Sequence, residues 1–173
     1  GAGSGNFSIV LFHILNKSLF DQIPDSLERI KHIITNMIFL VEINTESIKL
    51  LKERFGYNAN IYSGDYLETP TSFVVPDIII GNPPYNFNGL KKVPTLQDTK
   101  KKDDGITIWT YFVRKNMELL KENGYMNIVI PSIWLKPDNA GINNLLLQFK
   151  ITKMHTINGN KANKIFYKNG QTP

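Results

Sequence analysis

The stretch at residues 81–85 reads GNPPY and directly follows the apolar run PDIII. Proline fixes φ and has no backbone N–H, so two consecutive prolines end a strand and cannot continue it. Asn82 adds a side-chain carbonyl that can accept hydrogen bonds, and Tyr85 adds a flat aromatic ring. We therefore expect rigid acceptors and an exposed aromatic side chain at the tip of a buried strand, a combination that a purely structural turn does not require.

Three other features could hold a ligand. The segment GAGSGNF at residues 1–7 is rich in glycine, so its backbone amides can approach a ligand closely. Glu42 ends an apolar run, where a carboxylate can accept hydrogen bonds from both hydroxyls of a ribose. Asp65 follows Gly64 at the end of another run, where it could meet an adenine amino group. Taken singly, each feature is equally typical of an ordinary turn or strand end.

Hydrophobic spacing predicts the elements that must position these residues. Helices are expected over residues 7–20, 26–35, 45–56, 106–124 and 143–149, and strands over 37–44, 58–65, 76–85, 125–132 and 151–158. Alternating helices and near-continuous apolar strands predict an α/β fold, with a parallel sheet covered on both faces. In such a sheet ligands bind at the carboxyl ends of the strands, where all four features fall.

Residues 86–105 contain five Lys, three Asp and little periodic apolar content, which predicts a long mobile loop. The whole chain of 173 residues has the length of about one domain and carries a net charge of +5. This charge favours a polyanionic partner. The chain has neither a membrane-spanning apolar run nor a basic leader, so we expect a cytoplasmic protein.

Taken together, the glycine loop, Glu42, Asp65 and the NPPY motif are separated by 41, 23 and 17 residues. This order and spacing resemble the S-adenosylmethionine-dependent amino-methyltransferases, most closely the adenine-specific DNA methyltransferases of restriction-modification systems of the type IIG-like group. The segments NGYMNIVIPSIWLK and NKIFYKNGQTP look like later motifs of that family, so the resemblance covers nearly the whole chain.

The resemblance implies a Rossmann-like, doubly wound, mainly parallel sheet, the class I methyltransferase fold, over residues 1–173. That family has a strand before the glycine loop and a final hairpin strand beyond the last residue here. We therefore expect a catalytic domain truncated at both ends, which lacks its first strand, its final strand and a target-recognition domain. Such a piece alone is expected to show weak or no sequence-specific methylation.

Carried over position by position, the resemblance implies a site for S-adenosylmethionine and no metal. Glu42 would hold the ribose, Ile43 would pack on the adenine ring and Asp65 would face its amino group. The glycines of the first loop would line the methionine part. The other residues that the resemblance implies at the cofactor site are Gly1, Ala2, Gly3, Gly5, Asn6, Phe7 and Tyr66.

The same resemblance makes Asn82, Pro83, Pro84 and Tyr85 the catalytic motif. The lone pair of an adenine amino group is delocalised into the ring. Acceptors on its two hydrogens, the Asn82 side-chain oxygen and the Pro83 carbonyl, would free that lone pair for direct methyl transfer. Tyr85 would stack on a base flipped out of double-stranded DNA. The chain has no cysteine, which excludes the thiolate that methylation of cytosine carbon 5 requires.

Further substrate contacts are suggested by position alone. Phe166 would face the other side of the flipped base, although a phenylalanine in the core explains it as well. Cations of the loop after the motif would meet DNA phosphates, or simply be solvated; they are Lys91, Lys92, Lys100, Lys101 and Lys102.

Three other enzyme activities share the chemistry of the motif: methylation of the glutamine amide of release factors, of guanine N2 in ribosomal RNA, and of cytosine N4. A DNA-binding subunit that retains the fold is the alternative without catalysis. DNA adenine is favoured by the Lys-rich loop, the positive charge and the strand end at Pro131–Trp134.

Overall fold

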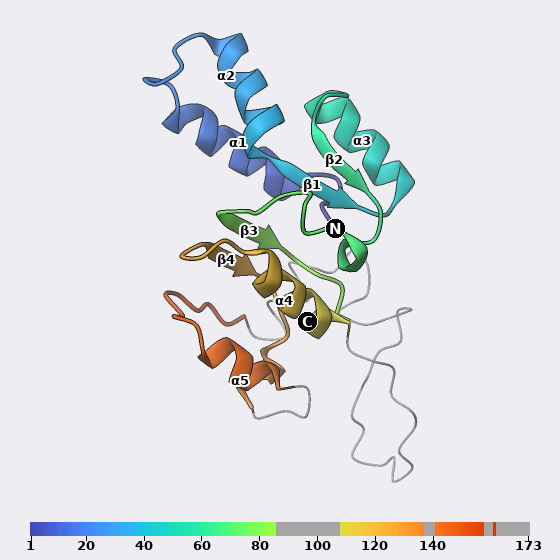
Figure 1. The fold of residues 1–173 in the computed structure, drawn as a ribbon, viewed down its shortest axis with the longest axis vertical. Helices are drawn as coiled ribbons and strands as arrows, with labels where there is room; N and C mark the ends of the chain where they lie inside the picture. The colour runs from blue at the N-terminus through green and yellow to red at the C-terminus, as the bar shows by residue number, and fades with distance from the viewer. Residues whose placement is uncertain (86–107, 137–140, 158–160, 162–173) are drawn as a thin grey trace. The chain divides into compact units, whose positions relative to one another are not determined.

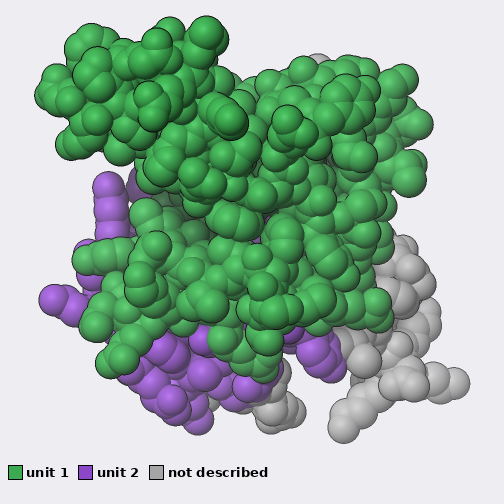
Figure 2. Space-filling model, turned by 45° about the horizontal axis from the view of Figure 1, so that its top comes forward, with its two compact units in different colours: residues 1–81, 118–128 green, residues 82–117, 129–173 purple. Residues whose placement is uncertain are grey.

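The computed structural model describes residues 1–85, 108–136, 141–157 and 161 (Figure 1). The chain forms two compact units, coloured separately in Figure 2. Unit 1 comprises residues 1–81 and 118–128, and unit 2 comprises residues 82–117 and 129–173. The strands that the structure describes all belong to unit 1.

Unit 1 begins with two helices. Helix α1 (Asn6–Ser18) follows the glycine loop, and α2 (Ser26–His32) is capped by the Asp25 side chain, which accepts a 2.8 Å hydrogen bond from the Glu28 amide. These helices confirm the prediction from spacing. A π turn (Ile33–Met37) continues α2, so the strand predicted to start at residue 37 begins only at residue 39.

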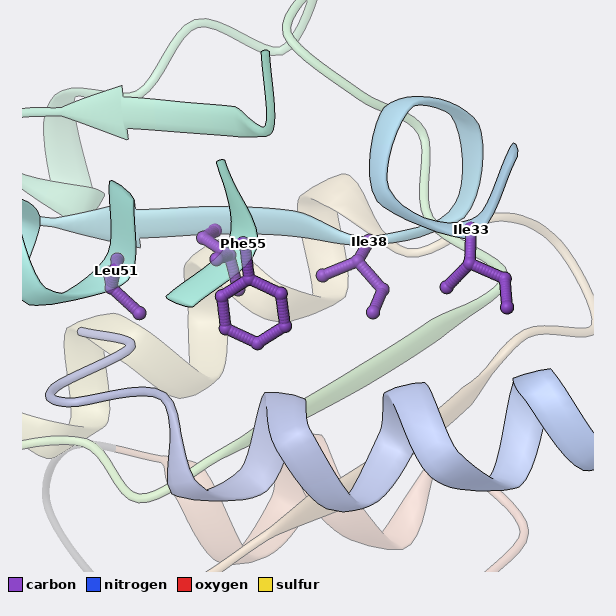
Figure 3. Close-up of a cluster of buried hydrophobic side chains, with 5 residues drawn as sticks. Ile33, Ile38, Leu51 and Phe55 are labelled. Carbon is purple, nitrogen blue, oxygen red and sulfur yellow. The ribbon is translucent and has the colours of Figure 1, made fainter. Parts of the chain in front are cut away.

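Strands β1 (Phe39–Glu42) and β2 (Asn60–Ser63) pair in parallel, with Glu42 opposite Ser63. Helix α3 (Thr45–Phe55) connects them, starting at the Asn44 cap and ending at Gly56 with φ 87°. The hydrophobic core of this part consists of Ile33, Ile38, Leu40, Leu51 and Phe55. Figure 3 shows the labelled side chains of this cluster pointing toward α1. The core thus holds the end of β1 close to the start of α1.

Strands β3 (Ile78–Gly81) and β4 (Tyr125–Ile128) form a second parallel pair in unit 1, with Gly81 opposite Ile128. Alternate residues of this pair are exposed: Ile78 is 55% and Tyr125 65% accessible. The predicted burial of β3 on both faces is therefore wrong in this structure. Strand side chains alternate between the two faces, and here one face of the pair lies open to solvent.

Unit 2 contains most of α4 (Trp109–Leu119), a 3-10 turn η4 (Ser132–Leu135) and α5 (Ile142–Leu147). Helix α4 buries one face at helical spacing, formed in unit 2 by Trp109, Phe112, Val113 and Asn116. The Asn143 side chain donates a 2.9 Å hydrogen bond to the Trp134 carbonyl, which ties α5 to η4.

Three predicted elements in the second half of the chain need correction. The helix expected to reach residue 124 ends at Leu119, and Asn123 adopts a left-handed φ of 63° just before β4. The strand expected over residues 125–132 stops at Ile128, because Pro131 opens the 3-10 turn. Residues 151–157, predicted as a strand, form none, since no neighbouring strand edge pairs with them in the described part of the chain.

The described strands form two separate two-stranded sheets, both parallel. The prediction of an α/β chain with parallel strand pairing is confirmed, whereas a single doubly wound sheet stays a prediction. Within the described ranges, no helix is long and apolar enough to cross a membrane.

Candidate functional site

The glycine loop is held against the carboxyl end of β1. The Ala2 amide donates to the Val41 carbonyl at 2.8 Å, and the Gly5 amide closes a turn onto the Ala2 carbonyl at 3.0 Å. Gly3 and Gly5 have φ angles of 56° and 86°, in the left-handed region that favours glycine. The loop thus needs glycine for its backbone conformation as well as for access.

Glu42 binds this loop directly. Its carboxylate is 6% exposed; Oε2 accepts a 2.7 Å hydrogen bond from the Gly3 amide, and Oε1 accepts from the amides of Ile43 and Asn44 at 3.0 and 2.9 Å. A side chain at Gly1 would bring its Cβ within 2.4 Å of Oε2. Since an ionised carboxylate has about four acceptor sites, three amide bonds leave Glu42 capacity for one more donor.

Helix α3 supports the other side of the loop. A Cβ at Gly5 would approach Leu51 Cδ2 to 2.9 Å and Phe55 to 3.1 Å, so α3 packs against the loop backbone. The Arg54 guanidinium Nη1 also donates to the Ser4 carbonyl. Arg54 was not predicted as a site residue, because a basic residue in the last turn of a helix is common and nothing in the local sequence marks its partner.

Asp65 lies directly after β2 and begins a short 3-10 turn (Tyr66–Glu68), where Oδ1 accepts from the Leu67 amide at 2.9 Å. The Gly64 amide, one residue before Asp65, donates to the Glu42 carbonyl at 3.0 Å, and the Glu42 carboxylate accepts from the glycine loop at Gly3. The structure brings together the glycine loop and the two acidic strand ends that the sequence analysis singled out.

Apolar and aromatic groups occur beside these acids in the chain. Ile43, the residue after Glu42, is 65% exposed, and Phe7 at the start of α1 is 51% exposed. Asn6 accepts a hydrogen bond from the Ser4 hydroxyl at 3.4 Å. Burial raises the pKa of Tyr66 to about 12, so this side chain stays neutral through the physiological range.

The NPPY motif begins unit 2, immediately after β3. Asn82 is exposed, and its Oδ1 accepts a 2.9 Å hydrogen bond from the Tyr85 hydroxyl. Tyr85 is only 9% exposed, and burial raises its pKa. The prediction of an exposed aromatic ring is therefore wrong in this structure, because the ring is buried while its hydroxyl bonds back to the first residue of the motif. Pro83 is buried and Pro84 exposed.

The remaining predicted residues lie outside the described ranges. These are the whole 86–105 loop, its cations Lys91, Lys92, Lys100, Lys101 and Lys102, and the aromatic Phe166.

A family model described as the Eco57I restriction-modification methylase matches residues 13–166. The matched range includes Glu42, Asp65 and the NPPY motif and begins after the glycine loop. No curated protein matches the chain.

Proposed function

The chain belongs to the family of Eco57I restriction-modification methylases, and we propose that it is the catalytic part of an adenine-specific DNA methyltransferase. In this proposal a methyl group passes from S-adenosylmethionine directly to the exocyclic amino group of an adenine flipped out of double-stranded DNA. The observation that carries the proposal is the Asn82 amide oxygen, exposed directly after a parallel strand and oriented by the Tyr85 hydroxyl.

The residues of unit 1 fit S-adenosylmethionine. Gly3 has open space where a side chain would stand, so a ligand can approach its backbone, and Glu42 retains an acceptor site for a ribose hydroxyl. The exposed Ile43 side chain is available to pack on an adenine ring, and Asp65 has a second carboxylate oxygen available for an amino group. When bound, S-adenosylmethionine supplies an electrophilic methyl group.

The NPPY motif supplies the acceptors for the target amine. A carbonyl oxygen has two lone pairs, and the Tyr85 hydroxyl uses one on Asn82 Oδ1, which leaves one for an amino hydrogen. The Pro83 carbonyl would take the second hydrogen. With both hydrogens accepted, the nitrogen lone pair would be free to attack the methyl carbon. The carbon–sulfur bond breaks, the thioether S-adenosylhomocysteine leaves, and one amino hydrogen is released as a proton to solvent, so no covalent enzyme intermediate is needed. Fixed acceptors of this kind commonly supply a factor of about 10²–10³ in rate.

Stacking by Tyr85 on the flipped base requires a change from the structure described here. The ring is buried, so its face becomes accessible only if the motif rearranges when DNA binds. Stacking of a base on an aromatic ring is worth about 1–3 kcal/mol, enough to offset part of the unstacking cost. In this proposal the Tyr85 ring stacks on the base only after DNA has bound.

For the fold, we propose the Rossmann-like, doubly wound sheet with its first and final strands outside residues 1–173. One observation supports a further strand beside β1. Successive carbonyls of a strand point to opposite sides. The Glu42 carbonyl accepts from Gly64 on the β2 side, whereas the Val41 carbonyl accepts from Ala2. The chain at Ala2 therefore lies on the edge of β1 opposite β2, where a preceding segment could extend the sheet.

Restriction-modification methylases act on DNA, so double-stranded DNA is the proposed partner and the cytoplasm the proposed location. A target-recognition domain beyond residues 1–173 would choose the sequence that is methylated. The 86–105 segment, proposed as a mobile loop, would carry its five lysines to the DNA backbone. Phe166 stays a candidate for the second face of the base.

The test is methyl transfer by the native protein that contains residues 1–173. Labelled S-adenosylmethionine is supplied with duplex DNA, ribosomal RNA or release factor, and the methylated DNA is digested to nucleosides. We expect label in DNA as N6-methyladenine. Label only in release factor or RNA, or recovered as N4-methylcytosine, would contradict the proposal. Residues 1–173 alone are expected to show weak or no site-specific transfer.

A further inference from the structure

Charge is distributed unevenly between the two units. Unit 2 contains 13 Lys and Arg residues and 4 Asp and Glu residues, a net charge of +9. Unit 1 contains 7 Lys and Arg residues and 11 Asp and Glu residues, a net charge of −4. The net charges of the two units add up to the +5 of the whole chain. The positive character of the protein therefore belongs entirely to unit 2, although unit 1 contains all the acidic cofactor candidates.

The described residues of unit 2 show this charge on the surface. They include six Lys and Arg residues, and within those same ranges there is no Asp or Glu. Lys136, Lys150 and Lys153 are all exposed. In unit 1, by contrast, Lys121 forms a 2.8 Å ion pair with Asp77. Exposed cations on a unit of net positive charge attract an external anion.

Two of these cations flank one structural element in the sequence. Lys136 follows the η4 turn, which the Asn143–Trp134 hydrogen bond joins to α5, and Lys150 comes three residues after the end of α5. Helix α5 has six residues and is therefore about 9 Å long. B-DNA carries one phosphate charge per about 1.7 Å of its axis, so an element of this length spans several phosphates.

We propose that Lys136, Lys150 and Lys153 form a contact surface for the phosphate backbone of duplex DNA. This surface is distinct from the lysines of residues 86–105. The inference rests on the proposed function, because the family match and the charge together favour DNA over another polyanion. A net negative unit 1 would also repel the backbone, so DNA would meet the protein on unit 2.

The test uses the native protein with all three lysines changed, K136Q/K150Q/K153Q. The matched control, K17Q/K31Q/K49Q, removes the same charge from three exposed lysines of unit 1. The equilibrium constant for a duplex that carries the target sequence is measured between 50 and 200 mM salt. Each lost phosphate contact lowers the slope of log K against log salt by about 0.9. We expect the unit 2 variant to lose about 2.7 from the slope and the control to keep its slope.

In fold-change terms, raising the salt over this interval should weaken the wild-type protein about 40-fold more than the unit 2 variant. An unchanged slope in the unit 2 variant, or an equal loss in both variants, would overturn the inference. So would a slope change seen with single-stranded RNA and absent with duplex DNA. Circular dichroism and thermal unfolding of both variants verify that each is folded.

The same samples separate this inference from the proposed function. Methyl transfer at low salt and saturating duplex should be equal in the wild type and the unit 2 variant, since none of the three lysines belongs to the proposed cofactor site or the NPPY motif. If the wild type methylates DNA but the slope does not change, only the contact surface is wrong. If the wild type does not methylate DNA, the proposed function has failed whatever the slope.

Discussion

The two units of the chain hold their candidate ligand-binding side chains in different ways. In unit 1 the key side chain is fixed: Glu42 is buried and bonded to three backbone amides. In unit 2 the key side chain is exposed: Asn82 is oriented by one hydrogen bond, from Tyr85. This contrast agrees with the proposal of a preformed cofactor site in unit 1 and an adjustable DNA site in unit 2.

Charge follows the same division. A small zwitterionic cofactor can be recognised by backbone amides, a carboxylate and an apolar side chain, none of which needs a net positive unit. DNA binding depends on many weak contacts between cations and phosphates. The net charges of −4 and +9 therefore agree with a cofactor site in unit 1 and a DNA surface in unit 2.

The strongest test of this division is a pair of reciprocal variants. Asn82→Ala removes an acceptor of the target amine, so we expect a loss of kcat of about 100-fold or more and an unchanged Kd for S-adenosylmethionine. Glu42→Gln places an amide group against backbone N–H donors, so we expect the Kd to rise about 10- to 100-fold, the equivalent of about 1.5–3 kcal/mol. Calorimetric binding and methyl-transfer kinetics measure the two effects.

Glu46→Gln is the control for the second variant, since Glu46 is exposed in the first turn of α3 and should leave the Kd unchanged. If Asn82→Ala weakened cofactor binding as much as Glu42→Gln does, the two functions would not be separable and the comparison between the units would be wrong.

A smaller effect is expected from two glycines of the same loop. Gly5→Ala places a Cβ at a left-handed φ and within 2.9 Å of Leu51, so we expect it to lower the free energy of unfolding by about 2–4 kcal/mol. Gly3→Ala has a left-handed φ of 56° but open space around it, so we expect about 1–2 kcal/mol. Urea unfolding measures both. Equal losses would show that packing on α3 does not hold the loop.

The smallest effect concerns a buried tyrosine of unit 1. Burial raises the pKa of Tyr66 to about 12, above the ordinary value of 10. The neutral form is therefore favoured in the folded protein. This contribution to stability is complete below pH 10 and is lost as the pH rises toward 12. We expect the free energy of unfolding of Tyr66→Phe to decrease less than that of the wild type as the pH rises from 10 toward 12. Tyr57→Phe, at an exposed position, should keep the wild-type fall.

Local patterns predicted much of unit 1 correctly. Glu42 and Asp65 were found because each follows a run of apolar residues, and such a run marks the strand itself. The helices also carry local signals, such as the Asp25 cap and the Gly56 stop. The sequence thus indicates where the strands end, and the folded chain brings the Glu42 carboxylate to the Gly3 amide.

Features that depend on distant partners were not predictable. Tyr85 has no local signal for burial, because its environment is set by tertiary packing and by the bond to Asn82. Residues 151–157 have strand-like composition, but a strand exists only where another edge pairs with it. The contact of Arg54 with Ser4 spans 50 positions of sequence, and no local pattern encodes it.

The discontinuity of unit 1 has a consequence for the order in which the protein can be made. Chains emerge from the ribosome N-terminus first. The β1–β2 pair is complete once residue 63 has emerged, so the glycine loop and Glu42 can assemble early. The β3–β4 pair must wait for residue 128, after the NPPY motif and the first part of unit 2 have been synthesised. Among the strands that the structure describes, therefore, β3 has no partner until β4 has been synthesised.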